Sequence, residues 1–208
     1  MAALIPSTDA CHSLSRPGHL QAQLRAATQA AHNQIETALG LLDPTLSLRR
    51  YGVSLAQFRS IYAPLEAQLA AFDWADHGLE FESRRKLPSI DADLSALGCP
   101  TPALIPSATC APDLERDRSR AFGCFYVLEG ATLGGQIISR HLRASLGVTP
   151  DTGGAFFHGY GERTGLMWTS FRDALACFAG RGADADRTVA TARQTFEALQ
   201  QAIDGDAR

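Results

Sequence analysis

The sequence predicts an all-α, bundle-like domain, and two observations carry this prediction. Apolar residues recur at steps of three and four along most of the chain, which is the spacing of one face of an α-helix. No run shows convincingly the strict alternation of a half-buried strand. Because a helix with one apolar face must bury it against another element, several such helices in 208 residues predict one helical bundle with a sizeable core.

The first helix is expected over residues 19–42. Its apolar positions define a continuous stripe, and the Asp-Pro pair that follows would end the helix. The stripe consists of Leu20, Leu24, Ala27, Ala31, Ile35, Ala38 and Leu42.

A second helix is expected to begin at Ser54. The Ser54 hydroxyl can cap the helix, and Gln57 completes the pattern of a capping box. Pro64 is expected to kink this helix, because proline removes a backbone donor from the helix interior. A short helix over residues 91–97 would stop at Gly98.

The rest of the chain is expected to alternate between helices and loops. Proline keeps residues 99–112 from being helical, so this segment is predicted to be a connecting loop. A long helix over 114–146 follows, and then a glycine-rich irregular stretch over 149–161. Two closing helices are expected near 163–178 and 184–203.

The long helix contains the most informative segment of the chain, Glu129-Gly130-Ala131-Thr132-Leu133-Gly134-Gly135-Gln136. Each interior glycine costs a helix about 1 kcal/mol relative to alanine, so three remove roughly 3 kcal/mol from a net stability of about 5–15 kcal/mol. Such a loss of stability indicates that the glycines are present for a packing or functional reason. Glycine allows a helix to bend and allows another surface to approach the backbone. A flat ligand lying on a kinked helix and a close helix–helix crossing both fit this pattern equally well.

Composition and charge exclude several classes of partner. The net charge is −3, which gives no argument for nucleic acid or an anionic membrane, and no stretch approaches the roughly 20 apolar residues of a membrane span. The five cysteines form no CxxC pair and are odd in number, which fits reduced thiols. We therefore expect a cytoplasmic protein, with residues 1–18 as a loose leader and 19–208 as a single domain.

Few residues are placed to carry chemistry. The chain lacks the paired Glu-x-x-His motifs of di-iron bundles, the clustered Cys and His of zinc sites, and the Gly-x-Ser-x-Gly elbow of many hydrolases. His32 is the best-placed single ligand, although a histidine in such a position is more often a hydrogen-bonded core residue. Arg25 lies two turns earlier on the same side, roughly 10 Å along the axis. A metal bound by His32, in a ligand whose peripheral carboxylates reach Arg25, would have the geometry of heme.

These residues belong to a longer pattern that resembles the heme oxygenase family over nearly the whole chain. The shared positions are Leu24-Arg25-Ala26-Ala27-Thr28, His32, Glu36, Tyr62, Glu66, Arg84, Asp93-Leu94, Leu97-Gly98, Glu129-Gly130 and Gly134-Gly135-Gln136. The match is to the bacterial, biliverdin-producing branch that is associated with bacteriophytochromes. Further positions similar to that branch are Gly159-Tyr160-Gly161, Trp168 and Phe171.

The resemblance implies a multi-helical fold in which heme is sandwiched between a proximal helix, here 19–42, and a glycine-kinked distal helix. It implies that His32 is the proximal iron ligand and that Arg25 contacts a heme propionate. The distal site residues would be Gly130, Gly134 and Gly135, which allow the backbone to approach the face where dioxygen binds.

The resemblance also implies the reaction and its participants. Heme would be both cofactor and substrate, and dioxygen with external electrons would convert it to biliverdin, ferrous iron and carbon monoxide. A soluble electron donor, such as a ferredoxin or a flavoprotein reductase, and a bacteriophytochrome as bilin acceptor are the implied partners. A non-catalytic heme-binding sensor or carrier on the same scaffold is the alternative.

The residue types suit these roles. A neutral imidazole is a suitable axial ligand, and Glu36 or a backbone carbonyl can orient its other ring nitrogen. Ala131 departs from the pattern, because many heme oxygenases carry an aspartate there that organises proton-delivering water. Thr132, Glu129 or backbone carbonyls near the glycines can take over this task, and the sequence does not choose among them.

The remaining candidates are expected to have structural roles. The basic run Arg84-Arg85-Lys86 is expected to be exposed, with a docking surface for an acidic electron donor as the alternative. Arg163 and Arg172 are candidates for reaching a propionate from the closing helices. Five aromatic residues are expected in the core rather than in a pocket wall: Phe125, Tyr126, Phe156, Phe157 and Trp168.

Overall fold

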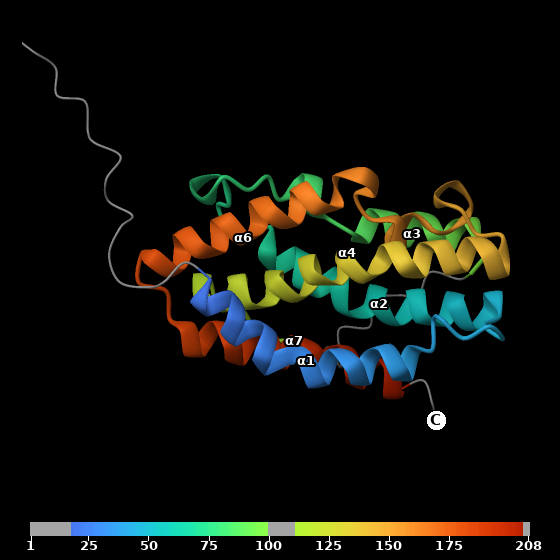
Figure 1. The fold of residues 1–208 in the computed structure, drawn as a ribbon, viewed down its shortest axis with the longest axis horizontal. Helices are drawn as coiled ribbons and strands as arrows, with labels where there is room; N and C mark the ends of the chain where they lie inside the picture. Colours follow the sequence, from blue (N-terminus) through green and yellow to red (C-terminus); the bar gives the residue numbers. More distant parts are fainter. Residues whose placement is uncertain (1–17, 100–110, 206–208) are drawn as a thin grey trace, which may run out of the picture.

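The computed structural model describes residues 18–99 and 111–205, and most of these residues lie in helices (Figure 1). This part of the chain contains no strand, so the all-α prediction is confirmed. The α-helices are α1 (His19–Leu39), α2 (Leu48–Leu69), α3 (Leu87–Ala96), α4 (Arg118–Leu146), α5 (Ala155–His158), α6 (Thr164–Gly180) and α7 (Ala185–Gly205). Short 3-10 turns are η1 (Ala75–His77), η2 (Glu82–Arg84), η3 (Pro150–Thr152) and η4 (Gly161–Arg163).

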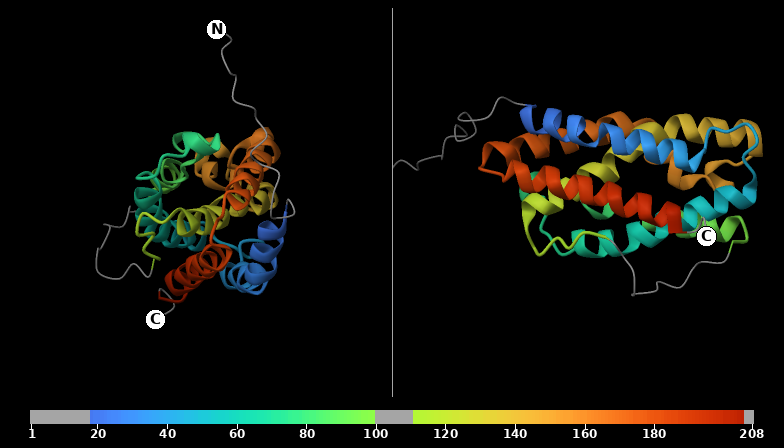
Figure 2. Two further views of the ribbon diagram at one scale, coloured as in Figure 1. Left: turned by 90° about the vertical axis from the view of Figure 1, so that its left-hand side faces the viewer. Right: turned by 90° about the horizontal axis from the view of Figure 1, so that it is seen from below.

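Helix α4 runs through the middle of the molecule, and the other helices surround it (Figures 1 and 2). Helices α1 and α7 lie side by side, and α7 also packs against α4 and α2. Helix α6 contacts α4 and α1, whereas the short α3 lies against α2 and α5. This arrangement places the glycine-rich part of α4 opposite α1.

The contact between α4 and α7 depends on Gly123, a glycine that the sequence analysis did not single out. A Cβ atom on Gly123 would overlap the backbone carbonyl of Thr188 on α7. The hydroxyls of Thr188 and Thr195 on the buried face of α7 donate to the carbonyls four residues earlier, those of Asp184 and Thr191, at 2.8 Å each, so they need no partner on α4. The two backbones can therefore approach closely without leaving a buried polar group unpaired.

Helix α1 ends three residues earlier than predicted. Gly40 adopts a left-handed conformation with φ of 57°, and its N–H donates to the carbonyl of Glu36 at 3.2 Å. Glycine favours this helix-ending geometry because it has no Cβ. Leu42 consequently lies outside the helix and is 52% exposed, while Leu39 takes the buried position.

Helix α2 begins earlier than predicted, at Leu48 instead of Ser54. The Ser47 hydroxyl is the actual cap and accepts a hydrogen bond from the Arg50 N–H at 3.2 Å. Ser54 lies inside the helix, where its hydroxyl donates to the Arg50 carbonyl. The helix continues past Pro64 to Leu69.

Helix α3 starts at Leu87 because a residue from another helix caps it. The Glu66 carboxylate on α2 accepts hydrogen bonds from the backbone N–H groups of Lys86 and Leu87, at 2.5 and 3.1 Å. These two donors would otherwise be unpaired at the helix start. A cap supplied from twenty residues away leaves no local sequence signal.

Helix α4 begins at Arg118, capped by the Asp117 carboxylate, and is continuous through Gly130, Gly134 and Gly135. The three glycines therefore do not interrupt its helical hydrogen bonding. Helices α6 and α7 lie close to the two predicted closing helices. The predicted leader and most of the predicted proline-rich loop lie outside the described residues.

Within the described ranges, α4 alone is long and apolar enough to cross a membrane by length and composition. More than half of its most apolar window is buried inside the protein. This burial is what the central helix of a bundle shows.

Candidate functional site

A cavity of about 640 Å³ lies between α1 and the glycine-containing part of α4, with further walls from α2, α5, α6 and α7. This volume is typical of sites that enclose a cofactor or small ligand. The walls are mainly apolar. All five site residues predicted from the sequence line this one cavity: Arg25, His32, Gly130, Gly134 and Gly135.

His32 presents its ring to the cavity from α1, and its side chain is 43% exposed. The ring Nδ1 is 3.5 Å from a Glu36 carboxylate oxygen one turn later, close enough for an ion pair but not aligned as a hydrogen bond. The ring also meets the aromatic ring of Phe196 on α7 edge-on, with 6.2 Å between centroids. Glu36 and Phe196 thus restrict the orientation of the ring, and Nε2 is the nitrogen left for a ligand.

Two arginines line the cavity, Arg25 from α1 and Arg172 from α6. Arg172 also borders a smaller hollow beside the first turn of α1, so it lies toward the N-terminal end of that helix. Trp168 and Tyr126 line the same cavity, and their rings are 5.8 Å apart. Arg163, the other arginine candidate on this side, does not line the cavity but contacts the Met167 sulfur.

The three distal glycines serve two different purposes. A Cβ atom on Gly130 or Gly134 would meet no other atom within 4 Å, so both glycines face open space at the cavity wall. A Cβ atom on Gly135 would lie 2.5 Å from the Phe157 carbonyl oxygen on α5. Gly135 therefore brings α4 and α5 into close contact, which confirms the packing interpretation at this residue, whereas Gly130 and Gly134 leave open space at the cavity wall.

The two side chains that could replace an aspartate at position 131, those of Glu129 and Thr132, are already engaged. The Thr132 hydroxyl donates to the Glu129 backbone carbonyl at 2.7 Å, and the Glu129 carboxylate is 1% exposed and ion-paired. Neither side chain offers a free acid to the cavity.

Glu129 belongs to a buried ion cluster that contradicts one prediction. Arg84 and Lys86 were expected to be exposed, but they are only 5% and 4% exposed. The Arg84 guanidinium pairs with Glu129 at 2.5 Å and also donates to Ser170 on α6 at 2.7 Å. Three adjacent basic residues in the sequence could not show that Arg84 and Lys86 are buried, because the carboxylate that pairs with them in the interior comes from α4. Arg85 is half-buried and pairs with Glu66 at 3.3 Å.

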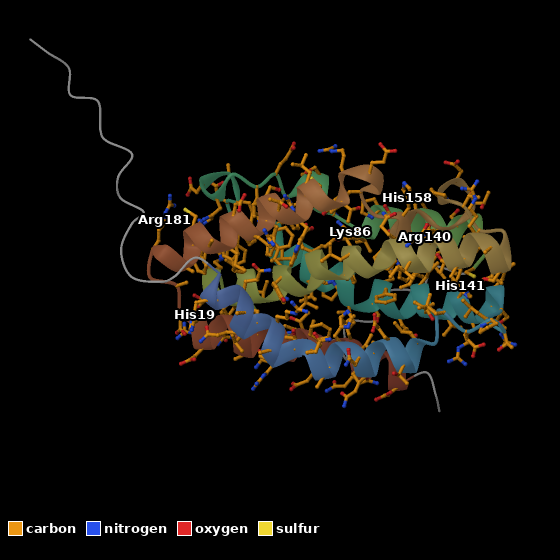
Figure 3. The ribbon with its side chains drawn as sticks, in the orientation of Figure 1. His19, Lys86, Arg140, His141, His158 and Arg181 are labelled. Carbon is orange, nitrogen blue, oxygen red and sulfur yellow. The ribbon has the colours of Figure 1, made fainter. Side chains whose placement is uncertain are left out.

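Lys86 lines the cavity and is held by the same cluster. Its ammonium donates to the Arg84 carbonyl at 2.6 Å and to the Tyr160 hydroxyl at 2.5 Å. The Tyr160 hydroxyl in turn donates to Glu129 at 2.5 Å. Figure 3 shows Lys86 in the body of the molecule, between His19 at one end and His141 toward the other.

Burial dominates the electrostatics of this cluster. It lowers the pKa of the Lys86 ammonium to about 8, an effect that Glu129 and Glu66 oppose and that Arg84 strengthens. Burial, reinforced by the charge of Glu129, raises the pKa of the Tyr160 hydroxyl well above its usual range. Tyr160 therefore stays neutral, and Lys86 titrates closer to neutral pH than an ordinary lysine.

Four of the five aromatic residues expected in the core also form the cavity wall: Tyr126, Phe156, Phe157 and Trp168. Only Phe125 of that set is confined to the core. The pattern of apolar residues cannot distinguish these two positions, since a ring can pack on the core with one face and border a cavity with the other. Lys86 is the charged cavity residue that was not predicted from the sequence, and its one available signal is that it is the only lysine in the chain.

Residues 18–204 match the family model described as heme oxygenase. A heme oxygenase from Xanthomonas campestris pv. campestris (strain 8004) is 35% identical over 95 residues, which are 45% of this chain and 53% of that protein. The chain therefore spans about half the length of this relative.

Solved heme oxygenases share the fold. One from Neisseria meningitidis, determined with bound NO and CO, has a TM-score of 0.74 at 18% identity. The match covers 89% of this chain and 90% of the Neisseria chain. One from Leptospira interrogans has a TM-score of 0.71 at 18% identity, and the match covers 89% of this chain and 98% of the Leptospira chain. Heme oxygenase-1 from Synechocystis sp. PCC6803, in complex with heme, has a TM-score of 0.64 at 16% identity, and the match covers 89% of this chain and 91% of the Synechocystis chain.

Proposed function

This chain belongs to the heme oxygenase family, and we propose that it binds heme in the cavity between α1 and α4 and cleaves it to biliverdin, ferrous iron and carbon monoxide. One observation carries the proposal. A single cavity brings together an imidazole from α1, two glycines with open space from α4, and two arginines.

The residues present fit heme. The porphyrin is flat and apolar, and the cavity is large, lined mainly by apolar and aromatic side chains, and bounded by Gly130 and Gly134, where any side chain would take up space. The buried Nδ1 of His32 makes no hydrogen bond within the described part of the chain and faces the Glu36 carboxylate. This arrangement suits a ligating imidazole, whose other nitrogen is commonly oriented by a carboxylate.

When bound, the heme supplies the redox chemistry with dioxygen and is itself the substrate. His32 would ligate the iron through Nε2, while the Glu36 carboxylate, facing Nδ1 at 3.5 Å, would help to orient the ring. Arg25 and Arg172 would bind the propionates, because a guanidinium can donate two hydrogen bonds to one carboxylate. Gly130 and Gly134 would leave room for dioxygen beside the α4 backbone, and the aromatic wall would exclude bulk water.

Electrons must come from outside the protein, and we propose a soluble donor such as a ferredoxin or a flavoprotein reductase. A bacteriophytochrome is the proposed bilin acceptor, and the cytoplasm the proposed location. Arg84 and Lys86 are buried, so they do not form a docking surface for the donor.

A second candidate function is a non-catalytic heme-binding sensor or carrier. The observation that favours it is Ala131, which lines the cavity at the position where many heme oxygenases carry an aspartate, with the side chains of Glu129 and Thr132 engaged elsewhere.

Titration with hemin followed by turnover separates the two functions. We expect one hemin to bind per chain with a histidine-ligated spectrum. On addition of ascorbate in air, the Soret band should decline as bilin absorption appears. A Soret band that persists without bilin formation would favour the carrier, and failure to bind hemin would reject both.

A further inference from the structure

The ion cluster beside the distal glycines has as many carboxylates as cations. Its cations are Arg84, Arg85 and Lys86, and its carboxylates are Glu66, Glu129 and the exposed Glu82. Arg84 pairs with Glu129 and Arg85 pairs with Glu66, at 2.5 and 3.3 Å. The Lys86 ammonium shares Glu129 with Arg84 and lies 3.7 Å from the carboxylate oxygen that accepts from the Tyr160 hydroxyl.

The Lys86 ammonium belongs to the cavity wall. Lys86 lines the same cavity as Gly130 and Gly134, and Glu129 directly precedes Gly130 in α4. An ammonium has three N–H donors, and two of them are used by the Arg84 carbonyl and the Tyr160 hydroxyl. The ammonium also makes longer contacts, 3.7 Å to a Glu129 carboxylate oxygen and 3.8 Å to the centroid of the Tyr160 ring.

The residue type is also informative. Of the 19 basic residues in the chain, Lys86 is the only lysine. An arginine would give the same charge and more hydrogen bonds, but it does not release its proton in proteins, whereas a buried lysine does so readily. The one lysine of the chain, whose ammonium can exchange its proton, thus has a buried position on the cavity wall.

On the basis of the proposed function, we propose that Lys86 supplies protons to the cavity in place of a carboxylate at position 131, with Glu129 and Tyr160 holding it in position. In this step, one N–H bond of the ammonium breaks and one O–H bond forms on a water molecule or substrate oxygen in the cavity. The electron pair stays on the nitrogen, and the neutral amine takes a new proton from bulk water.

The charged groups around Lys86 make this proton available near neutral pH. Burial lowers the pKa of the ammonium to about 8, Arg84 lowers it further, and Glu129 and Glu66 act in the opposite direction. Most of the protein then carries the charged acid at pH 7, and this fraction falls as the pH rises through about 8. Tyr160 does not compete as a donor, since burial and Glu129 raise the pKa of its hydroxyl.

The single lysine allows a direct measurement that does not depend on turnover. Protein labelled with carbon-13 and nitrogen-15 in lysine gives one lysine side-chain signal, and its titration by NMR in the heme-free protein should have a midpoint near 8. In Tyr160→Phe the ammonium loses a hydrogen-bond acceptor, so the midpoint should move lower still. A midpoint near the ordinary lysine value would overturn the proposal.

Two variants test the role in catalysis. Lys86→Arg keeps the charge but not the exchangeable proton, and Lys86→Met removes both. With hemin bound, both variants should form bilin at least about a hundredfold more slowly than the wild type in a single turnover, since general acids contribute about 10²–10⁴-fold. The decline in wild-type rate as the pH rises through about 8 should be absent from both. Arg118→Gln, a change at a cation on α4 that pairs with Asp76 and lies outside both this cluster and the cavity, is the control and should stay within about twofold of the wild type.

The outcomes separate the possible roles of Lys86. Bilin formation at the wild-type rate by Lys86→Arg would overturn the assignment of Lys86 alone. Weaker hemin binding by Lys86→Met, restored by Lys86→Arg and with unchanged rates per bound hemin, would show that the ammonium binds a substrate carboxylate instead. A wild-type protein that binds hemin but forms no bilin would overturn the proposed function itself.

Discussion

The adjacent glycines Gly134 and Gly135 provide a matched test of how α4 is built. In both Gly134→Ala and Gly135→Ala, the helix gains about 1 kcal/mol of intrinsic propensity. The new methyl at position 134 meets no atom within 4 Å, so this variant should be more stable than the wild type by about that amount. The new methyl at position 135 would lie 2.5 Å from the Phe157 carbonyl oxygen, well inside the 3.4 Å at which ordinary contact begins.

The magnitude follows from the difference between the two variants, because the propensity gain cancels. Overpacking of this kind costs about 1–3 kcal/mol, so Gly134→Ala should exceed Gly135→Ala in unfolding free energy by that amount. Urea unfolding of the heme-free proteins, followed by far-UV circular dichroism, measures it. Equal stabilities, or a more stable Gly135→Ala, would refute the assignment of Gly134 to the open wall and Gly135 to the α4–α5 contact.

Two further substitutions address the ligand and the ion cluster. His32→Ala should abolish the histidine-ligated spectrum and turnover, with partial recovery of both on addition of imidazole; an unaltered spectrum would reject His32 as the ligand. Glu129→Gln leaves Arg84 and Lys86 without their buried carboxylate, and we expect a loss of roughly 3–5 kcal/mol in unfolding free energy by urea titration. Glu82→Gln, at a carboxylate that is 71% exposed and pairs with Arg85, should lose less than about 1 kcal/mol, and similar losses in both variants would contradict the account.

The site residues that could be predicted from the sequence are those whose neighbours are local. Arg25 and His32 share one side of α1 because helical periodicity places them there, and the glycines of α4 were recognisable as an anomaly within an apolar helix. The sequence could not show that Gly135 packs against α5 while the other two glycines face open space, because this depends on where the Phe157 carbonyl of α5 lies in space.

The errors arose where a distant group decides the local structure. Glu66 caps α3 from α2, and Glu129 draws Arg84 into the interior from α4. A run of basic residues looks the same in sequence whether it faces water or buried carboxylates. The early end of α1 is a different case, because Gly40 is a local signal for a helix end and precedes the Asp-Pro pair.

A crystal structure of the hemin complex tests the central claim most directly. The account predicts iron bonded to Nε2 of His32, the porphyrin between α1 and the wall formed by Gly130 and Gly134, and at least one propionate on Arg25 or Arg172. Heme held by another histidine, or located outside the cavity between α1 and α4, would contradict it.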